Sequence, residues 1–403
     1  MRIEKSILAI LLISLHSLAG LFAGMDPDAG TSAASFLRID PGARPAGMGG
    51  AYTALSDDAN AVYFNPAGLA RSYSSEVTLM YSSWLAGMNY NYLSFKFPKY
   101  SFGSLAAAAY MLNSGDITRT TEDEYGLFES RSGSFTASDR AFAVAYAVNI
   151  FAASSAGIAA KYIVQENESE RGSAIAFDAG LMFLVPGINL NTGVAVRNIG
   201  SGLKIGDEIF SLPLEISAGV EYKPGGCMKA VFDADFPADN SPSFALGAEY
   251  DLKKFLRLRC GYRYRYEVSE LGFFSGLHTG LGLEWKKYSF DYAWVPLGKL
   301  GSTHRLSLNM AFSSSRTAEG GSSVIIDTRP RFKSSDIYFD GKLKGNTLVR
   351  IDDVAPGLHH ITLKIPPVLV FKHKIIIKEP GQVFNVRFDS LGKIIIKTTP
   401  INK

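Results

Sequence analysis

Thr303-His304-Arg305-Leu306-Ser307-Leu308-Asn309-Met310-Ala311-Phe312 alternates large apolar side chains with polar or small ones. Successive residues of a β-strand point to opposite faces of the sheet, so this stretch predicts a strand with one apolar and one polar face. The same period of two runs through residues 273–285 and 287–295. In the last of these, Tyr288, Phe290, Tyr292 and Trp294 share one face, opposite Ser289, Asp291 and Ala293.

Fourteen segments of strand character lie between Ser74 and Phe312. They span residues 74–84, 88–98, 101–112, 138–149, 154–165, 173–184, 188–198, 212–222, 226–236, 242–251, 255–266, 273–285, 287–295 and 303–312. Most are close to the ~9–11 residues that a tilted strand needs to cross a bilayer, and bacterial membrane barrels have an even strand number. The sequence therefore predicts an all-β fold in which residues 74–312 form a fourteen-stranded antiparallel transmembrane β-barrel.

The connections support this prediction, because short and long ones alternate from the third segment on. Short turns are expected at 150–153, 185–187, 223–225, 252–254 and 286, and longer polar loops at 113–137, 166–172, 199–211, 237–241, 267–272 and 296–302. Outer-membrane barrels have short periplasmic turns and longer outside loops. The first two connections, 85–87 and 99–100, are both short and fit this alternation less well.

The N-terminus predicts a secretory signal peptide over residues 1–24. Arg2 and Lys5 precede an apolar core at 6–18, and small residues then offer cleavage sites before Met25.

No later run approaches the ~18–20 apolar residues of a spanning helix, which excludes a helical membrane protein. The net charge of +3 is small and no basic run occurs, so nucleic acid is not an expected partner. Cys227 and Cys260 lie on strands separated by one other strand, too far apart for a disulfide, and are expected to be free.

Residues 42–70 are rich in glycine and alanine and end in Asn65-Pro66-Ala67-Gly68-Leu69. This stretch resembles the N-terminal plug of outer-membrane long-chain fatty acid transporters of the FadL type, and the same opening occurs in PorV/PorQ-like relatives. The resemblance implies a plug, or hatch, over residues 25–73 that moves when a hydrophobic ligand binds; a static plug is the alternative. The expected gating residues are Gly47, Gly49, Gly50, Asp57, Asp58, Phe64, Asn65, Pro66 and Ala67. For Asp57 and Asp58, a solvated turn is favoured over a salt bridge in the lumen.

Arginines gather on one face of the segment 255–266. Alternate positions carry Arg257, Arg259, Arg263 and Arg265, so the four side chains point to the same face of the strand. An arginine that faced lipid near the bilayer midplane would cost ~2–4 kcal/mol, so these four are expected to face the lumen. Five acidic residues on flanking strands are expected to point inward as well: Asp233, Asp235, Glu249, Glu284 and Asp291. The prediction is a charge network along the lumen wall; the functional alternative is an arginine that binds a fatty-acid carboxylate or selects anions.

A small second domain follows the barrel. Residues 313–323 predict a polar linker, and residues 324–403 alternate short strands with turns such as Asp340-Gly341. The spacing resembles a PEGA-type β-sandwich domain, which would lie in the periplasm and bind a periplasmic protein or peptidoglycan. Phe312, an aromatic residue that ends the last barrel strand, resembles the signal that such barrels present to the barrel assembly machinery.

The motifs favour transport over catalysis. No nucleophile or metal-ligand motif occurs, so neither an enzyme nor a cofactor or metal is expected. The resemblance implies an outer-membrane channel of a diderm bacterium, surrounded by outer-membrane lipids, for passive uptake of long-chain fatty acids or other hydrophobic compounds. The alternative is a PorV-like component of a secretion system that binds exported cargo. Small residues in 101–112 and 154–165 mark either a lateral opening or the place where the plug packs.

Overall fold

The computed structural model describes residues 29–72, 74–97, 102–151, 154–168, 170–185, 189–225, 227–253, 255–265 and 271–312, and the strands of the C-terminal part. The chain divides into two compact units, Met1–Phe312 and Ser313–Lys403. The signal-peptide and linker predictions, residues 1–24 and most of 313–323, lie outside the described residues.

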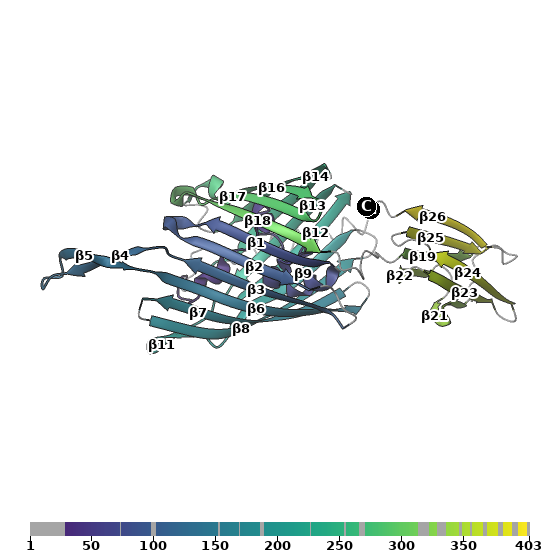
Figure 1. The fold of residues 1–403 in the computed structure, drawn as a ribbon, viewed down its shortest axis with the longest axis horizontal. Coiled ribbons are helices and arrows are strands. Elements are labelled where there is room, and N and C mark those ends of the chain that lie inside the picture. Colours follow the sequence, from purple (N-terminus) through teal and green to yellow (C-terminus); the bar gives the residue numbers. More distant parts are fainter. Residues whose placement is uncertain are drawn as a thin grey trace. The chain divides into compact units, whose positions relative to one another are not determined.

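Fourteen antiparallel strands among the described residues close into a barrel (Figure 1). They are β1 (Ser75–Ser83), β2 (Asn89–Lys96), β3 (Ser104–Asn113), β6 (Ala137–Phe151), β7 (Ser154–Asn167), β8 (Glu170–Val185), β9 (Leu190–Gly200), β12 (Glu215–Gly225), β13 (Met228–Pro237), β14 (Ser243–Lys253), β15 (Leu256–Tyr264), β16 (Leu277–Trp285), β17 (Tyr288–Pro296) and β18 (Ser302–Phe312). Each pairs with its neighbours in the chain, and β1 pairs with β18, from Ser75 opposite Phe312 to Ser83 opposite His304. The predicted strand number, direction and closure are confirmed.

The two faces of the wall differ in the way that the period of two predicts. Outward side chains are large and apolar, for example Leu306, Phe290 and Leu246, each more than half exposed. Inward side chains on the same strands are polar or small and buried, for example Ser307, Asp291 and Ala245. The inner face is therefore the core of this unit.

The connections between the strands lie at the two ends of the barrel. We call one end the turn end; its connections are 97–103, 152–153, 186–189, 226–227, 254–255 and 286–287. We call the other the loop end; its connections are 84–88, 114–136, 168–169, 201–214, 238–242, 265–276 and 297–301. The predicted long loop 166–172 is wrong, because β7 and β8 continue their ladder as far as Asn167 opposite Glu170. The loop 113–137 carries the hairpin β4 (Ile117–Glu122) and β5 (Phe128–Phe135), which extends beyond the other strands in Figure 1. The loop 201–214 carries the smaller pair β10 (Leu203–Ile205) and β11 (Glu208–Phe210), and short 3-10 turns, η3 (Leu85–Gly87), η4 (Phe273–Gly276) and η5 (Gly298–Leu300), lie in other loops.

Residues 29–72, the N-terminal segment, form four short helical turns (purple in Figure 1). These are η1 (Ser35–Arg38), α2 (Ala43–Gly47), α3 (Ala61–Phe64) and η2 (Pro66–Arg71). Three of them, α2, α3 and η2, contact the inner face of the barrel. The α2 turn contacts β15–β18, and η2 contacts β6–β8. No helix among the described residues has the length and apolarity to cross a membrane.

The C-terminal unit is built from two four-stranded sheets among its described residues. One has the order β22 (Val349–Val354), β19 (Ser322–Thr328), β25 (Gln382–Phe388), β26 (Ile394–Pro400), and the other β21 (Lys342–Gly345), β20 (Asp336–Phe339), β23 (Gly357–Ile365), β24 (Leu369–Ile377). Buried apolar residues from both sheets form one core, including Val324, Phe384, Ile337 and Ile361. The packing of two sheets around this core is a β-sandwich.

Candidate functional site

Seven glycines on the inner face of the barrel allow the N-terminal segment to approach the wall at backbone distance. They are Gly157, Gly180, Gly193, Gly219, Gly247, Gly261 and Gly280, one from each of seven strands, and we call them the glycine girdle. A Cβ at Gly261 would collide with the backbone of Met48 and Gly49, and one at Gly157 with that of Pro66. Because only glycine lacks a Cβ, main chain can touch main chain here. The girdle was not predicted from the sequence.

Two polar side chains fix this contact. The buried carboxylate of Asp233 accepts hydrogen bonds from the backbone N–H groups of Tyr52 and Thr53, at 2.8 and 2.7 Å. The Asn65 side-chain amide donates to the carbonyls of Thr53 and Leu181, at 3.0 and 3.2 Å, and its oxygen accepts from the Ala67 N–H at 3.1 Å. Asn65 thus links two parts of the segment to the barrel wall.

Arg44 occupies the centre of an ion-pair cluster that we call the Arg44 network. Its guanidinium contacts Glu249 of β14 at 2.9 Å, Asp57 at 2.7 Å and Asp58 at 2.9 Å. Glu249 also pairs with Lys229 and with Arg259, which in turn reaches Asp291. The network joins residues of the N-terminal segment to four barrel strands.

The Arg44 network corrects one expectation. Asp57 and Asp58 are half-buried ion-pair partners, so the favoured interpretation, a solvated turn, is wrong. Burial opposes ionisation of Asp57, but the nearby Arg44 and Lys229 outweigh it and lower its pKa to about 2. The Asp57 carboxylate is therefore charged at neutral pH.

A cavity of about 510 Å³, which we call the vestibule, lies at the loop end above the N-terminal segment. Its apolar lining consists of Phe36, Ile39, Trp84, Leu85, Leu112, Pro237, Leu271, Val295, Leu297 and Leu300. Its charged lining consists of Arg38, Asp40, Asp139, Glu215, Asp235, Arg263, Arg265 and Arg305, with His278 beside them. Residues 35–40 form the floor, and barrel strands and loops form the walls.

Within the described part of the chain, some buried hydrogen-bond donors of the arginines that line the vestibule are unpaired. Arg263 pairs with the Asp40 carboxylate at 2.8 Å, and Arg305 donates to the Asp40 carbonyl. Burial disfavours the charged form of Asp40, but Arg263 and Arg305 reverse this and lower its pKa. The buried Nε–H groups of Arg38, Arg263 and Arg305 nevertheless have no partner among the described residues. These Nε–H groups are closed off from solvent, so an acceptor oxygen from outside the chain would reach them only after the arginine side chains move.

The structure separates the arginines that the sequence grouped. Arg263 and Arg265 line the vestibule, whereas Arg259 belongs to the Arg44 network. Arg257 lies nearer the turn end, where it pairs with Asp251 and Glu284. Of the acids, Asp235 accepts from Ser217 at 2.6 Å and lines the vestibule. These arginines thus lie on the inner side of the wall, as predicted. They belong to three separate clusters, namely the vestibule, the Arg44 network and the ion pairs of Arg257.

The other predicted residues lie as follows. Gly47 packs on Gly280, Gly49 lies beside Tyr262, and Gly50 lies beside Arg263 and Asp40. Phe64 is buried with its ring 5.1 Å from that of Tyr52, and Pro66 and Ala67 begin η2. Phe312 ends β18 opposite Ser75, and Cys227 and Cys260 are free as predicted.

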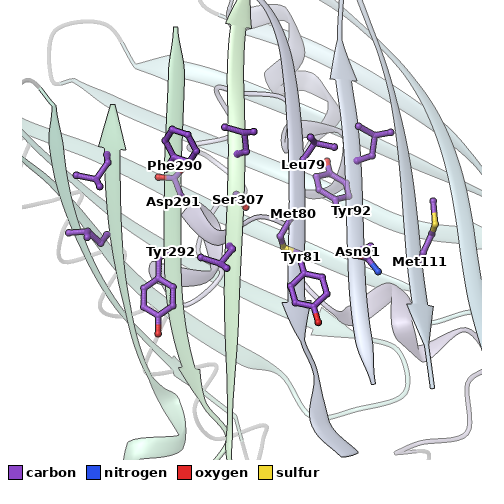
Figure 2. Close-up of a pocket in the computed structure, with 15 residues that line it drawn as sticks. Leu79, Met80, Tyr81, Asn91, Tyr92, Met111, Phe290, Asp291, Tyr292 and Ser307 are labelled. Carbon is purple, nitrogen blue, oxygen red and sulfur yellow. The ribbon is translucent and has the colours of Figure 1, made fainter. Parts of the chain in front are cut away.

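The outer wall carries an apolar groove of about 610 Å³ on both sides of the β1–β18 pair (Figure 2). Leu79, Tyr81, Phe290 and Tyr292 border it, and the inward residues Met80 and Ser307 contribute to its base. Behind the wall, Met80 and Ser307 accept hydrogen bonds from the backbone N–H groups of Gly42 and Ala43. The small-residue strands around 101–112 and 154–165 instead contact η2, as one of the two interpretations expected.

No family model matches the chain, and no curated protein matches it. Similar solved structures include the CymD monoaromatic hydrocarbon channel, at 12% identity and a TM-score of 0.47, covering 68% of this chain and 97% of that chain. The toluene transporter TbuX of Ralstonia pickettii has 11% identity and a TM-score of 0.44, covering 68% and 97%. A FadL homologue of Pseudomonas aeruginosa has 11% identity and a TM-score of 0.43, covering 68% and 98%. These values are too low to assign the chain to a family.

Proposed function

We propose that this protein is an outer-membrane channel for passive uptake of hydrophobic compounds, with long-chain fatty acids as the favoured ligands. The closed wall satisfies its own backbone hydrogen bonds, and its exposed outer side chains are apolar, as lipid requires. The loop end would then face outside the cell, because long loops of such barrels lie there.

The vestibule carries the proposal. Its apolar walls suit an acyl chain, and the guanidinium groups of Arg38, Arg263 and Arg305, which line it, suit a carboxylate head group. A purely hydrocarbon ligand would leave these donors unused. The combination therefore favours an amphipathic anion over a neutral hydrocarbon.

In this proposal the N-terminal segment is the plug of the barrel and the vestibule is the entrance. The outer groove at β1 and β18 is the proposed lateral exit, because residues 42–43 lie directly behind its base. A path from the lumen to the groove would need these residues to shift and the β1–β18 ladder, continuous from Ser75 to Ser83, to separate locally. Of the two small-residue strands considered from the sequence, 101–112 borders this groove through Met111, and no residue of 154–165 lines it.

Arg305→Gln is expected to weaken oleate binding to the purified protein by about tenfold, because one charge-assisted hydrogen bond is lost. Arg305 lines the vestibule, is only 5% exposed and keeps a buried, unpaired Nε–H. The measurement is a fluorescence titration in detergent, with oleyl alcohol as the matched uncharged ligand. Equal losses for acid and alcohol would indicate structural damage, and unchanged oleate binding would contradict the proposal.

Uptake tests the function as a whole. Cells that carry the chain should accumulate labelled oleate faster than cells that lack it, and Arg305→Gln should reduce the difference. Growth on oleate as carbon source gives an independent measurement. Equal uptake with and without the protein would exclude the transport proposal.

A second candidate function, a PorV-like secretion component that binds exported cargo, is favoured by the β4–β5 hairpin. Tyr125, Leu127 and Phe128 at its tip are 79%, 64% and 64% exposed. Large apolar side chains grouped in water commonly mark protein interaction sites. The tip also carries Glu122, Asp123, Glu124 and Glu129, which suits a basic partner.

Removal of residues 118–134 distinguishes the two functions. The hairpin lies outside the barrel sheet, so the shortened chain should fold and keep its oleate uptake if transport is the function. The secretion role would be favoured if neither the full nor the shortened chain supported oleate uptake and only the full chain copurified with secreted cargo. Heat-modifiable migration on gels checks that the barrel has folded.

A further inference from the structure

Positive charge is concentrated in the C-terminal unit. Residues 313–403 contain 15 Lys and Arg against 8 Asp and Glu, a formal charge of +7, whereas residues 1–312 contain 26 against 30, a charge of −4. A charge difference of this kind between parts of one chain points to an anionic partner for the basic part.

Within the unit the charge belongs to one of the two sheets. Strands β20, β21, β23 and β24 contain five lysines and one aspartate, whereas β19, β22, β25 and β26 contain three basic and three acidic residues. The excess is therefore not spread evenly over the sandwich.

The outer face of the basic sheet is defined by its register. Ile337, Ile361 and Leu363 are buried in the sandwich core, so their neighbours in the strands point outward. On that side His360 lies opposite Lys374, and Thr362 opposite Lys372. Lys364, Lys372 and Lys374 are exposed, and we call this surface the lysine face.

An aromatic and an aliphatic side chain complete the lysine face. The ammonium of Lys364 lies 4.6 Å from the centre of the Tyr338 ring, and Val370, opposite Lys364, is 49% exposed. Asp336, opposite Lys364 on β20, is the acidic residue of these strands. Lysines beside a tyrosine and a small apolar side chain are typical of surfaces that rest on lipid head groups.

We propose that the lysine face docks on the surface of a bilayer containing anionic phospholipids. Nine residues separate the last barrel strand, which ends at Phe312, from Ser322, and even fully extended they span only about 35 Å. If the barrel spans a membrane as proposed above, this tether keeps the unit within reach of the leaflet at the turn end, where Phe312 lies. Docking would hold the sandwich against that leaflet.

The test uses the full chain in nanodiscs of pure phosphatidylcholine, mixed with separate vesicles that contain phosphatidylglycerol. Sedimentation of the vesicles measures the bound protein. The wild type should bind these vesicles, should bind pure phosphatidylcholine vesicles much more weakly, and should dissociate as salt is raised. The triple variant Lys364→Gln, Lys372→Gln, Lys374→Gln should bind on the order of 100-fold more weakly.

The matched control removes the same charge from exposed residues at the loop end, Arg171→Gln, Lys204→Gln and Lys299→Gln, and should bind as the wild type does. Single lysine variants, each expected to lose about fivefold, keep the test valid if the triple variant misfolds. Equal binding to both vesicle types, or unchanged binding of the lysine variants, would overturn the proposal. Binding to peptidoglycan sacculi without binding to anionic vesicles would also overturn it. Oleate uptake plays no part in these measurements, so the two proposals fail separately.

Discussion

Arg44→Ala is expected to lower the free energy of unfolding of the barrel by about 3 kcal/mol, because Asp57 and Asp58 lose their closest cation and Glu249 keeps only Lys229 and Arg259. The Arg44 side chain is 11% exposed, and its loss leaves the almost fully buried Glu249 without its partner on the N-terminal segment. The temperature at which the purified protein loses its compact migration on gels measures this effect. In planar bilayers the variant should also conduct ions more often than the wild type, since the segment is released from β14.

Arg257→Gln is the control for this experiment. Arg257 is 26% exposed and pairs with partly exposed acids, Asp251 and Glu284, so its loss should cost less than about 1 kcal/mol. If Arg44→Ala matches this control in both stability and conductance, the Arg44 network does not hold the segment.

Gly180→Leu is expected to prevent the N-terminal segment from seating in the barrel. A Cβ at this position would overlap Asn65 and Pro66, and overpacking of a tight contact typically costs about 1–3 kcal/mol or more. Ala179→Leu is the matched control, because the adjacent residue of β8 is exposed on the outer face. Protease cleavage within residues 29–72 should rise strongly in Gly180→Leu and stay unchanged in Ala179→Leu. Equal protection of both variants would show that the girdle contact does not hold the segment.

The strands of the barrel could be predicted from the sequence because each one is a local pattern. A period of two, as in residues 303–312, follows from one face in contact with apolar surroundings and the other with the polar inside. The ends of β7 and β8 could not be predicted, since their polar residues 165–167 and 170–171 continue the ladder where the composition indicates a loop. The β4–β5 hairpin was missed for the same reason.

The vestibule could not be predicted, because its members are far apart in the sequence. Arg38, Arg263 and Arg305 come together only when the barrel closes around the N-terminal segment. The alternation within β15 predicts that Arg263 points inward. No local sequence pattern predicts its ion pair with Asp40, which is more than 200 residues away in the chain. The glycine girdle did leave a signal, namely at least one inward glycine in each of seven strands, as in the directly opposed pair Gly247 and Gly261.

The close fit between the N-terminal segment and the glycine girdle has a consequence for biogenesis. The segment is synthesised first, yet its partners Glu249 and Ser307 follow about 200 and 260 residues later. Contacts of such long separation form slowly, because the intervening chain must first lose its freedom. In a closed barrel, the inward side chains would obstruct the entry of the N-terminal segment to its final position. The nascent sheet must therefore stay open, with the segment already resting on it, until β1 meets β18 as the final step.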